Sequence, residues 1–324
     1  MQKRWLLGVG VALLTIAGLS VSAQAEYPDK PIHIVVPYTP GGTVDLLARA
    51  LAPHLTKDWG QQIVVENRPG AGGSVGAEYV AQAPGDGYTL LLATNSPLTT
   101  NVAVFKTIKY DPLKDFVPVI IAGENSLALA VNPKLPVKSV ADLIALAKKE
   151  PGKLICASSG NGATSHMSLG EFEKMAGVKI THVPYRGGVP SLTAVISGEA
   201  QMVFADVVPT VPMMRDGRVH VLATTGLHRS GVTPNVPTLD ELGLKGFSVT
   251  AWVPMVAPKG TPKAVVDKLN AEINKILKDK EFRAQLIRLG IDPIGDTPEQ
   301  AATYLRDQLP IWKERAREAG LKVD

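Results

Sequence analysis

Short apolar runs that look like strands alternate with amphipathic helical segments along most of the chain, and this alternation constrains the fold more than any other feature. In one helical segment, Val140–Lys149, one face is apolar and Ser139 is a candidate N-cap. Continuous apolar strands separated by helices predict βαβ units and sheets covered on both faces, so the fold class is α/β. The strand candidates are Ile32–Val36, Ile63–Glu66, Tyr88–Ala93, Leu127–Val131, Leu154–Ala157, Val178–His182, Met202–Phe204 and Val219–Ala223.

Two longer extended stretches, Phe116–Val131 and Val219–Thr225, interrupt this alternation. We interpret each of them as a crossing between two sheets. A chain that crosses twice has a discontinuous first lobe with a second lobe inserted into it. We therefore predict a first lobe from residues 26–122 and 225–324, and a second lobe from residues 123–224.

The C-terminal segment contains only helical patterns. Thr297-Pro298-Glu299-Gln300 is a capping box with proline at the first helical position, which predicts the start of the last helix. Pro310 is expected to kink this helix. We expect the tail to pack back across one lobe.

The N-terminus has the pattern of a secretory signal. Lys3 and Arg4 precede an apolar run from Trp5 to about Leu19, and the small-residue sequence Ala23-Gln24-Ala25 follows. This pattern predicts a signal peptide at residues 1–25, cleavage after Ala25 and a soluble protein in the periplasm. The alternative is a membrane anchor, but the apolar run is shorter than the roughly 20 residues that a spanning helix needs.

Composition and motif spacing argue against several classes of function. Without Lys3 and Arg4 the formal net charge falls from +4 to +2, because 32 basic residues then face 30 acidic ones, which is too little to indicate nucleic-acid binding. The histidines lack H-E-x-x-H spacing and the glycine-rich stretches lack dinucleotide-binding spacing, so we predict no metal and no cofactor. Cys156 is the only cysteine, and we expect it to be buried and inert.

Small polar loops follow several of the predicted strands, at residues 37–45, 94–96, 158–166 and 184–188. Ligands of open parallel sheets bind beyond the carboxyl ends of the strands, which is where these loops lie. In the first loop, Gly41 and Gly42 allow backbone N–H groups to converge on an anion, and the following helix adds positive charge at its N-terminus. We therefore predict a carboxylate site, although each loop taken alone could be an ordinary turn.

Several stretches resemble, in their order and spacing, the Bug/TctC-like family of tripartite tricarboxylate transporter substrate-binding proteins. They are residues 37–45, Glu66–Gly73, Pro84–Leu90, 185–188, Asn235–Thr238, Trp252 and Ala257–Pro262. The resemblance covers nearly the whole mature chain. It implies a type II periplasmic-binding-protein fold, in which two βαβ lobes are joined by two crossover strands and a ligand cleft lies between them.

The same resemblance implies a periplasmic receptor that is a monomer and not an enzyme. Such a receptor captures a small carboxylate by lobe closure and delivers it to the membrane components of a tripartite transporter. The ligand class stays open between a di- or tricarboxylate, an acidic amino acid and an aromatic acid. A periplasmic ligand sensor that feeds a signalling partner is the alternative function.

The resemblance also assigns ligand contacts by position, and the predicted loops offer Arg186 as the only nearby cation. Many relatives carry acidic residues where Gln201 and Ala205 stand, so a family rule for ligand preference does not carry over to this chain. His166 could contact ligand or cap and pack its helix, and Trp252 could line the cleft or belong to a core. The assigned contacts are Tyr38, Thr39, Gly42, Asp45, Asn95 and Ser96 in the first lobe, and Ser158, Gly160, Asn161, Ala163, Thr164, His166 and Tyr185 in the second. Asp206 is a further candidate, because it lies beyond the end of a predicted strand.

Overall fold

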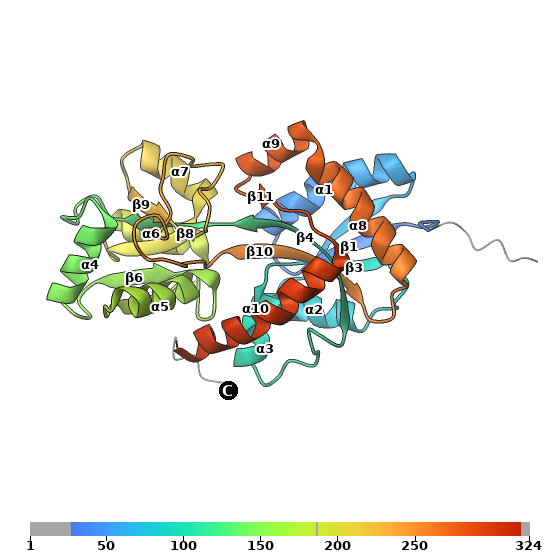
Figure 1. Cartoon of the computed structure of the whole chain (residues 1–324), viewed down its shortest axis with the longest axis horizontal. Helices are drawn as coiled ribbons and strands as arrows, with labels where there is room; N and C mark the ends of the chain where they lie inside the picture. The colour runs from blue at the N-terminus through green and yellow to red at the C-terminus, as the bar shows by residue number, and fades with distance from the viewer. Residues whose placement is uncertain (1–26, 186, 319–324) are drawn as a thin grey trace, which may run out of the picture.

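The computed structural model describes residues 27–185 and 187–318, so the predicted signal peptide and Arg186 lie outside the described residues. Two sheets lie side by side, each with helices packed on it (Figure 1). The first has the strand order β11-β4-β10-β3-β1-β2, from β1 Ile32–Val36, β2 Ile63–Asn67, β3 Thr89–Leu92, β4 Phe116–Asn125, β10 Ala251–Pro258 and β11 Asp292–Pro293. The second has the order β7-β6-β8-β5-β9, from β5 Leu127–Val131, β6 Ile155–Ser158, β7 Thr181–Pro184, β8 Met202–Asp206 and β9 His220–Thr224.

Parallel pairing dominates where helices connect the strands. In the first sheet β1 pairs in parallel with β2 and β3, and in the second β6 pairs in parallel with β7 and β8. The central strands are apolar and buried on both faces, as their sequences predict. Cys156 is buried within β6, and burial raises the pKa of its thiol. The predicted α/β class is confirmed.

The helices begin and end where local sequence signals favour it. Ser139 Oγ accepts a hydrogen bond from Asp142 N at 3.1 Å, which confirms the predicted N-cap. Thr297 Oγ1 accepts from Gln300 N at 3.2 Å, while Gln300 Oε1 accepts from Thr297 N at 2.9 Å, as the capping box predicts. The helices are α1 Thr43–Trp59, α2 Ser74–Ala81, α3 Thr100–Val104, α4 Val140–Lys149, α5 Thr164–Ala176, α6 Gly188–Ser197, α7 Val207–Arg215, α8 Lys263–Lys278, α9 Lys280–Arg288 and α10 Pro298–Glu318.

The chain crosses between the sheets at two places. The first crossing is the short step from the end of β4 at Asn125 to the start of β5 at Leu127, as predicted. The second was predicted at Val219–Thr225, and this is wrong because β9 pairs with β5 inside the second sheet. The chain instead returns just before β10, whose first residue, Ala251, pairs with Asn125.

The segment between β9 and β10 packs on the second sheet. Leu239, Leu244, Phe247 and Val249 are buried in the same core as the strands β5, β6 and β8. These contacts favour a lobe boundary near residue 250 over the predicted boundary near residue 225.

Helix α10 extends along both sheets (Figure 1). Ala301 and Leu305, in its first half, are buried in a core of the first sheet, and Trp312 is buried in the core of the second. Arg315 Nε donates to Glu171 Oε2 of α5 at 3.1 Å. The helix continues through Pro310. The expectation that the tail contacts one lobe is therefore wrong, because its two apolar halves are buried in different cores.

Candidate functional site

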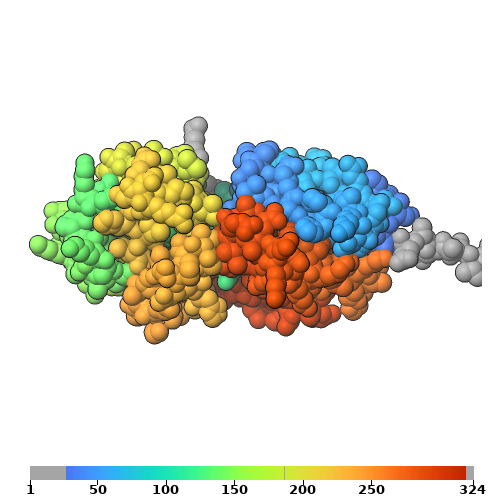
Figure 2. Space-filling model, turned by 90° about the horizontal axis from the view of Figure 1, so that it is seen from above, coloured from blue at the N-terminus to red at the C-terminus, as the bar shows by residue number. Residues whose placement is uncertain are grey.

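Two adjoining cavities lie where the two sheets meet, and we call them together the cleft. The first has a volume of about 170 Å³ and the second about 180 Å³. Each is smaller than the roughly 300 Å³ at which pockets for drug-sized ligands begin, so the cleft suits a small molecule. From above, the two halves of the molecule meet along a narrow furrow (Figure 2).

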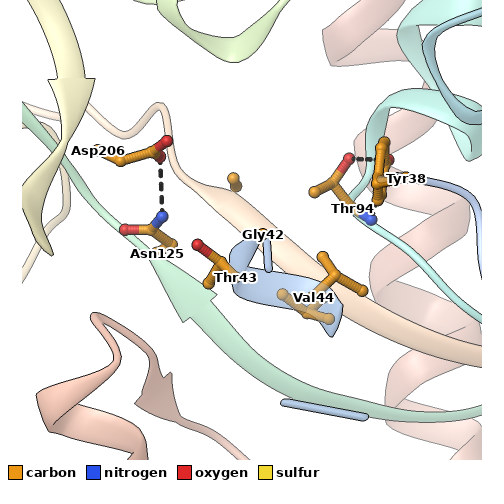
Figure 3. Close-up of a pocket in the computed structure, with 9 residues that line it drawn as sticks. Tyr38, Gly42, Thr43, Val44, Thr94, Asn125 and Asp206 are labelled. Atoms are coloured by element: carbon orange, nitrogen blue, oxygen red, sulfur yellow. Dashed lines mark hydrogen bonds between the residues drawn. The ribbon is translucent and has the colours of Figure 1, made fainter. Parts of the chain in front are cut away.

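Both lobes contribute to the walls of the cleft, and Thr94, Asp206 and Ala251 line both cavities. The first cavity is also lined by Tyr38, Gly42, Thr43, Val44, Asn125 and Val253 (Figure 3). The second is also lined by Ser96, Leu127, Ser159, Ala163, Thr164, Ser165, Gly188, Phe204 and Ala205.

Parallel pairing explains why these residues meet. The carboxyl ends of β1 and β3 lie at one edge of the first sheet, so the loops at 37–45 and 94–96 are neighbours. The ends of β6 and β8 lie at one edge of the second sheet in the same way. The loops that the sequence places after parallel strands therefore converge between the lobes.

Tyr38 and Thr94 form one wall of the first cavity. The hydroxyl groups of the two side chains lie 2.5 Å apart, and Thr94 N donates to Tyr38 Oη at 3.3 Å. Burial raises the pKa of Tyr38 to about 12, so its hydroxyl stays neutral and can donate or accept a hydrogen bond.

Asp45 stabilises the first loop through hydrogen bonds of its buried side chain. Its side chain is 2% exposed, and its carboxylate accepts hydrogen bonds from Gly41 N at 2.9 Å, Arg49 Nε at 3.0 Å and Asn67 Nδ2 at 2.9 Å. Burial alone would raise the pKa of Asp45, but these donors hold it below its usual range. Asp45 does not line the cleft; it fixes the glycine turn that does.

Two histidines support the loop that follows β6. The rings of His166 and His182 stack with centroids 3.8 Å apart and an interplanar angle of 11°. His182 Nε2 lies 2.6 Å from Ser158 Oγ, and His166 Nδ1 accepts from Gly162 N at 3.3 Å. Burial, together with the neighbouring His182, lowers the pKa of His166 to about 4, and burial also lowers the pKa of His182. Both rings are therefore neutral at pH 7.

This arrangement predicts a pH dependence of stability. His166 has a pKa of about 4 when folded and 6.5 ordinarily, so between these values the unfolded chain binds a proton that the folded chain does not. Its contribution to stability is present above pH 6.5 and decreases toward pH 4, by at most roughly 3 kcal/mol. Urea unfolding at pH 7.5 and 5 should show a smaller pH dependence in His166→Gln than in the wild type. His220→Gln, at an exposed position, should keep the pH dependence of the wild type. The same change in the free energy of unfolding between pH 7.5 and 5 in all three proteins would contradict the role assigned to His166.

The structure separates the predicted contacts into two groups. Tyr38, Gly42, Ser96, Ala163, Thr164 and Asp206 line the cleft. Thr39, Asp45, Asn95, Ser158, Gly160, Asn161, His166 and Tyr185 are not among the residues that line it. Residues of the second group are bonded within the protein instead: Tyr185 N donates to Ser158 O at 2.9 Å, and Ser158 Oγ lies 2.6 Å from His182 Nε2. Direct contact with ligand stays a prediction for all of them.

Sequence analysis missed several residues of the lining. Thr94, Ser159 and Ser165 belong to loops that the sequence singled out, and their hydroxyl groups were the available signal. Asn125 and Ala251 lie at the crossings, and only their pairing with each other brings them to the cleft. Trp252, beside Ala251, is 1% exposed and packs on Tyr304 with ring centroids 5.1 Å apart, so it belongs to a core.

One serine lies in a motif that is typical of hydrolases. Residues 72–76 match the hydrolase pattern G-x-S-x-G, in which the serine is exposed on a sharp turn beside a histidine base. Ser74 is instead 6% exposed, and its Oγ accepts from Asn101 Nδ2 at 3.0 Å. The environment of Ser74 therefore does not support a nucleophile.

The described residues contain no group of three or more histidine, cysteine or acidic side chains placed to hold a metal ion. Within residues 27–185 and 187–318, no helix is both long and apolar enough to cross a membrane.

Two α/β lobes with a cleft at the carboxyl ends of their parallel strands define the type II periplasmic-binding-protein fold. Residues 47–321 match the family described as "Tripartite tricarboxylate transporter family receptor", and the chain belongs to this family. Its members are periplasmic substrate-binding receptors and not enzymes.

Individual relatives match along nearly their full length. Protein BugT of Bordetella pertussis is 35% identical over 324 residues, which cover 99% of this chain and 99% of BugT. The solved structure of R. palustris Rpa4515 with adipate has a TM-score of 0.82 at 35% identity and covers 92% of this chain and 99% of that one. Periplasmic binding protein BugD has a TM-score of 0.77 at 33% identity, with coverage of 91% and 99%. The predicted fold and family are confirmed.

Proposed function

We propose that the protein is a monomeric periplasmic receptor, without catalytic activity, that captures a small carboxylate in the cleft and delivers it to the membrane components of a tripartite transporter. The observation that carries this proposal is the chemistry of the lining. Hydroxyl groups come from both lobes, and the N-terminal residues of α1 and α5, Thr43 and Thr164, face the cleft. The adipate bound to the R. palustris relative supports a carboxylate ligand.

Helix N-termini and hydroxyl groups can hold a carboxylate without a salt bridge. The first backbone N–H groups of a helix have no partner within the helix, and the helix dipole favours an anion at that end. The described residues that line the cleft include no lysine, arginine or histidine. Among the described residues, the groups that could hold a ligand carboxylate are therefore neutral donors.

Because both lobes line the cleft, closure would bring a second set of donors onto a ligand already held by the first. The ligand must bind the closed form more tightly than the open form, since equal affinity for both would shift no population.

Thermal unfolding of the protein, stripped of bound ligand by unfolding and refolding, tests this function. The panel contains adipate, succinate, malate, citrate, aspartate, glutamate and aromatic acids, with neutral sugars and amines as controls. A ligand at about 100 times its Kd stabilises by roughly 2.7 kcal/mol, which should raise the midpoint by roughly 5 °C or more. A shift with certain acids and with none of the controls is the expected result. A shift with a sugar or an amine only would rule out a carboxylate receptor.

Replacing Gly42 with valine should weaken ligand binding by about tenfold or more, equivalent to about 1.4 kcal/mol, and leave the protein folded. Gly42 has φ −76° and ψ 165°, which any residue adopts, and the nearest atom to an added Cβ is Thr39 O at 3.8 Å. The valine side chain would therefore be accommodated, but it would occupy the first cavity. Circular dichroism checks the fold and calorimetry the affinity; unchanged affinity in the folded variant would refute the assignment of this cavity.

A further inference from the structure

We propose that Asp206 recognises a protonated amine on the ligand, so that the preferred ligand of the cleft is an amino acid and not the corresponding unsubstituted carboxylate. The proposal rests on the proposed function, because it names the ligand class of the same cleft. Asp206 is the last residue of β8 and directly precedes α7. Its side chain lines both cavities.

The carboxylate of Asp206 is only partly satisfied by the protein. Oδ1 accepts one hydrogen bond, from Asn125 Nδ2 at 3.0 Å (Figure 3). Among the described residues, no donor binds Oδ2 and no lysine, arginine or histidine pairs with this carboxylate. A Cβ added to Gly188 would be 3.5 Å from Oδ2, so Gly188 packs beside this oxygen at van der Waals distance. Because Oδ2 has no donor among the described residues and Asp206 lines both cavities, a donor group of a ligand in the cleft could bind it.

Asp45 is a buried carboxylate of the same protein that does not line the cleft, and it serves as a comparison. Its two oxygens accept from a backbone N–H, an arginine and an asparagine. Buried acidic groups are normally paired in this way, because an unpaired one loses its hydration without compensation. Asp206, by contrast, has a hydrogen-bond donor on Oδ1 only, and it lines the cleft.

Ionised Asp206 would discriminate between ligand groups by charge. A second carboxylate placed beside it would be repelled, while an ammonium group would pair with it in a site of low dielectric. Two helix N-termini, those of α6 at Gly188 and of α7 at Val207, lie next to Asp206 and favour its charged form. Burial acts in the opposite direction and raises the pKa of Asp206, and a bound cation would reverse that effect.

The first cavity offers sites for both charged groups of an amino acid. Gly42 and Thr43, at the N-terminus of α1, supply donors for the carboxylate, and Asp206 supplies an acceptor for the amine. In Figure 3 the carboxylate of Asp206 extends toward the space bounded by Thr43 and Thr94. A ligand with adjacent carboxylate and ammonium groups would accept hydrogen bonds at the N-terminus of α1 and donate to Asp206 at the same time.

Calorimetry with matched ligands tests this proposal. The members of each set differ only in a substituent next to one carboxylate: propionate, lactate and alanine; succinate, malate and aspartate; adipate and 2-aminoadipate. In the wild type, the amine-bearing member of the set that fits should bind at least about tenfold tighter than the unsubstituted acid. In the isosteric variant Asp206→Asn this advantage should fall by about tenfold or more, while the affinity for the unsubstituted acid stays the same or rises. Asp240→Asn is the matched control, because Asp240 is a partly exposed aspartate that is bonded to Lys245 and Gly246 and does not line the cleft.

Other outcomes overturn the proposal in distinguishable ways. Tight binding of unsubstituted acids with no amine preference would leave the carboxylate receptor intact and remove the role of Asp206. Unchanged affinities for all members of a set in Asp206→Asn would indicate a protonated Asp206 that donates to the ligand carboxylate, because the asparagine amide also donates. An equal loss for all members in both Asp206→Asn and Arg186→Gln would indicate that Asp206 acts through Arg186 and not through a ligand amine. If no acid bound to the wild type, the proposed function itself would fail, and this inference with it.

Discussion

Replacing Trp312 with alanine should lower the free energy of unfolding by about 3–5 kcal/mol, the usual cost of removing a buried tryptophan. The side chain is 1% exposed and is packed in the core of the second sheet. Its Nε1 donates to Gln308 Oε1 at 3.2 Å, and the guanidinium carbon of Arg315 lies 5.4 Å from the ring centroid. The substitution removes a large apolar surface, leaves a cavity and weakens the attachment of α10 to the second lobe.

Urea unfolding followed by circular dichroism measures this effect. Ile311 precedes Trp312 on the same helix and is 43% exposed, so Ile311→Ala should change stability by no more than about 0.5 kcal/mol. Similar midpoints for the two variants would show that α10 is not anchored through Trp312.

The position of α10 bears on lobe closure. Because Leu305 is buried with the first sheet and Trp312 with the second, the helix is a third connection between the lobes, in addition to the two crossings. The proposed closure would therefore have to bend or shift α10 relative to one core. The capping box and the apolar residues of the tail were visible in the sequence, but their assignment to different cores was not, since periodicity identifies a buried face and not its partner.

Strand prediction succeeded where one physical signal dominated. Ile32–Val36 and Leu127–Val131 are short aliphatic runs, and both were predicted with the observed bounds. Strand β10 was missed because proline argues against a central strand. Pro254 is tolerated because it lies at an irregularity, where the pairing of β10 with β4 shifts register. Such an irregularity depends on a partner more than 120 residues away in the sequence and cannot be predicted locally.

The candidate site was predictable at the level of loops but not of side chains. Parallel strands place their following loops together whatever the loops contain, so residues 37–45 and 158–166 were identified correctly as neighbours of the cleft. Which side chain of a loop faces the cleft depends on competing partners from elsewhere. Asn67, at the end of β2, binds Asp45, and His182, in β7, stacks on His166. Asp45 and His166 were predicted to contact ligand, but with these partners they are not among the residues that line the cleft.

Replacing Asp45 with alanine should destabilise the protein by about 2–4 kcal/mol and weaken ligand binding as well. The substitution leaves the Gly41 N–H, the Asn67 amide and the Arg49 guanidinium without their common acceptor. Arg49 is 49% exposed and can turn to water, so we expect the loss to stay near the lower end for a buried ion pair. The loop that carries Gly42 would lose its anchor, and binding would have to restore its order.

Asp58 is the matched control, because it lies on the same helix and also pairs with a cation. Its partner is Lys275, whose Nζ donates to Asp58 Oδ2 at 2.9 Å at the protein surface. Asp58→Ala should leave both the unfolding midpoint and the ligand affinity unchanged, since exposed pairs contribute little. In Asp45→Ala, we expect the affinity for the best-binding acid of the panel to fall by about tenfold at a temperature where the variant is fully folded. If stability falls but affinity does not, Asp45 supports only the fold of α1, and the glycine turn holds its shape without it.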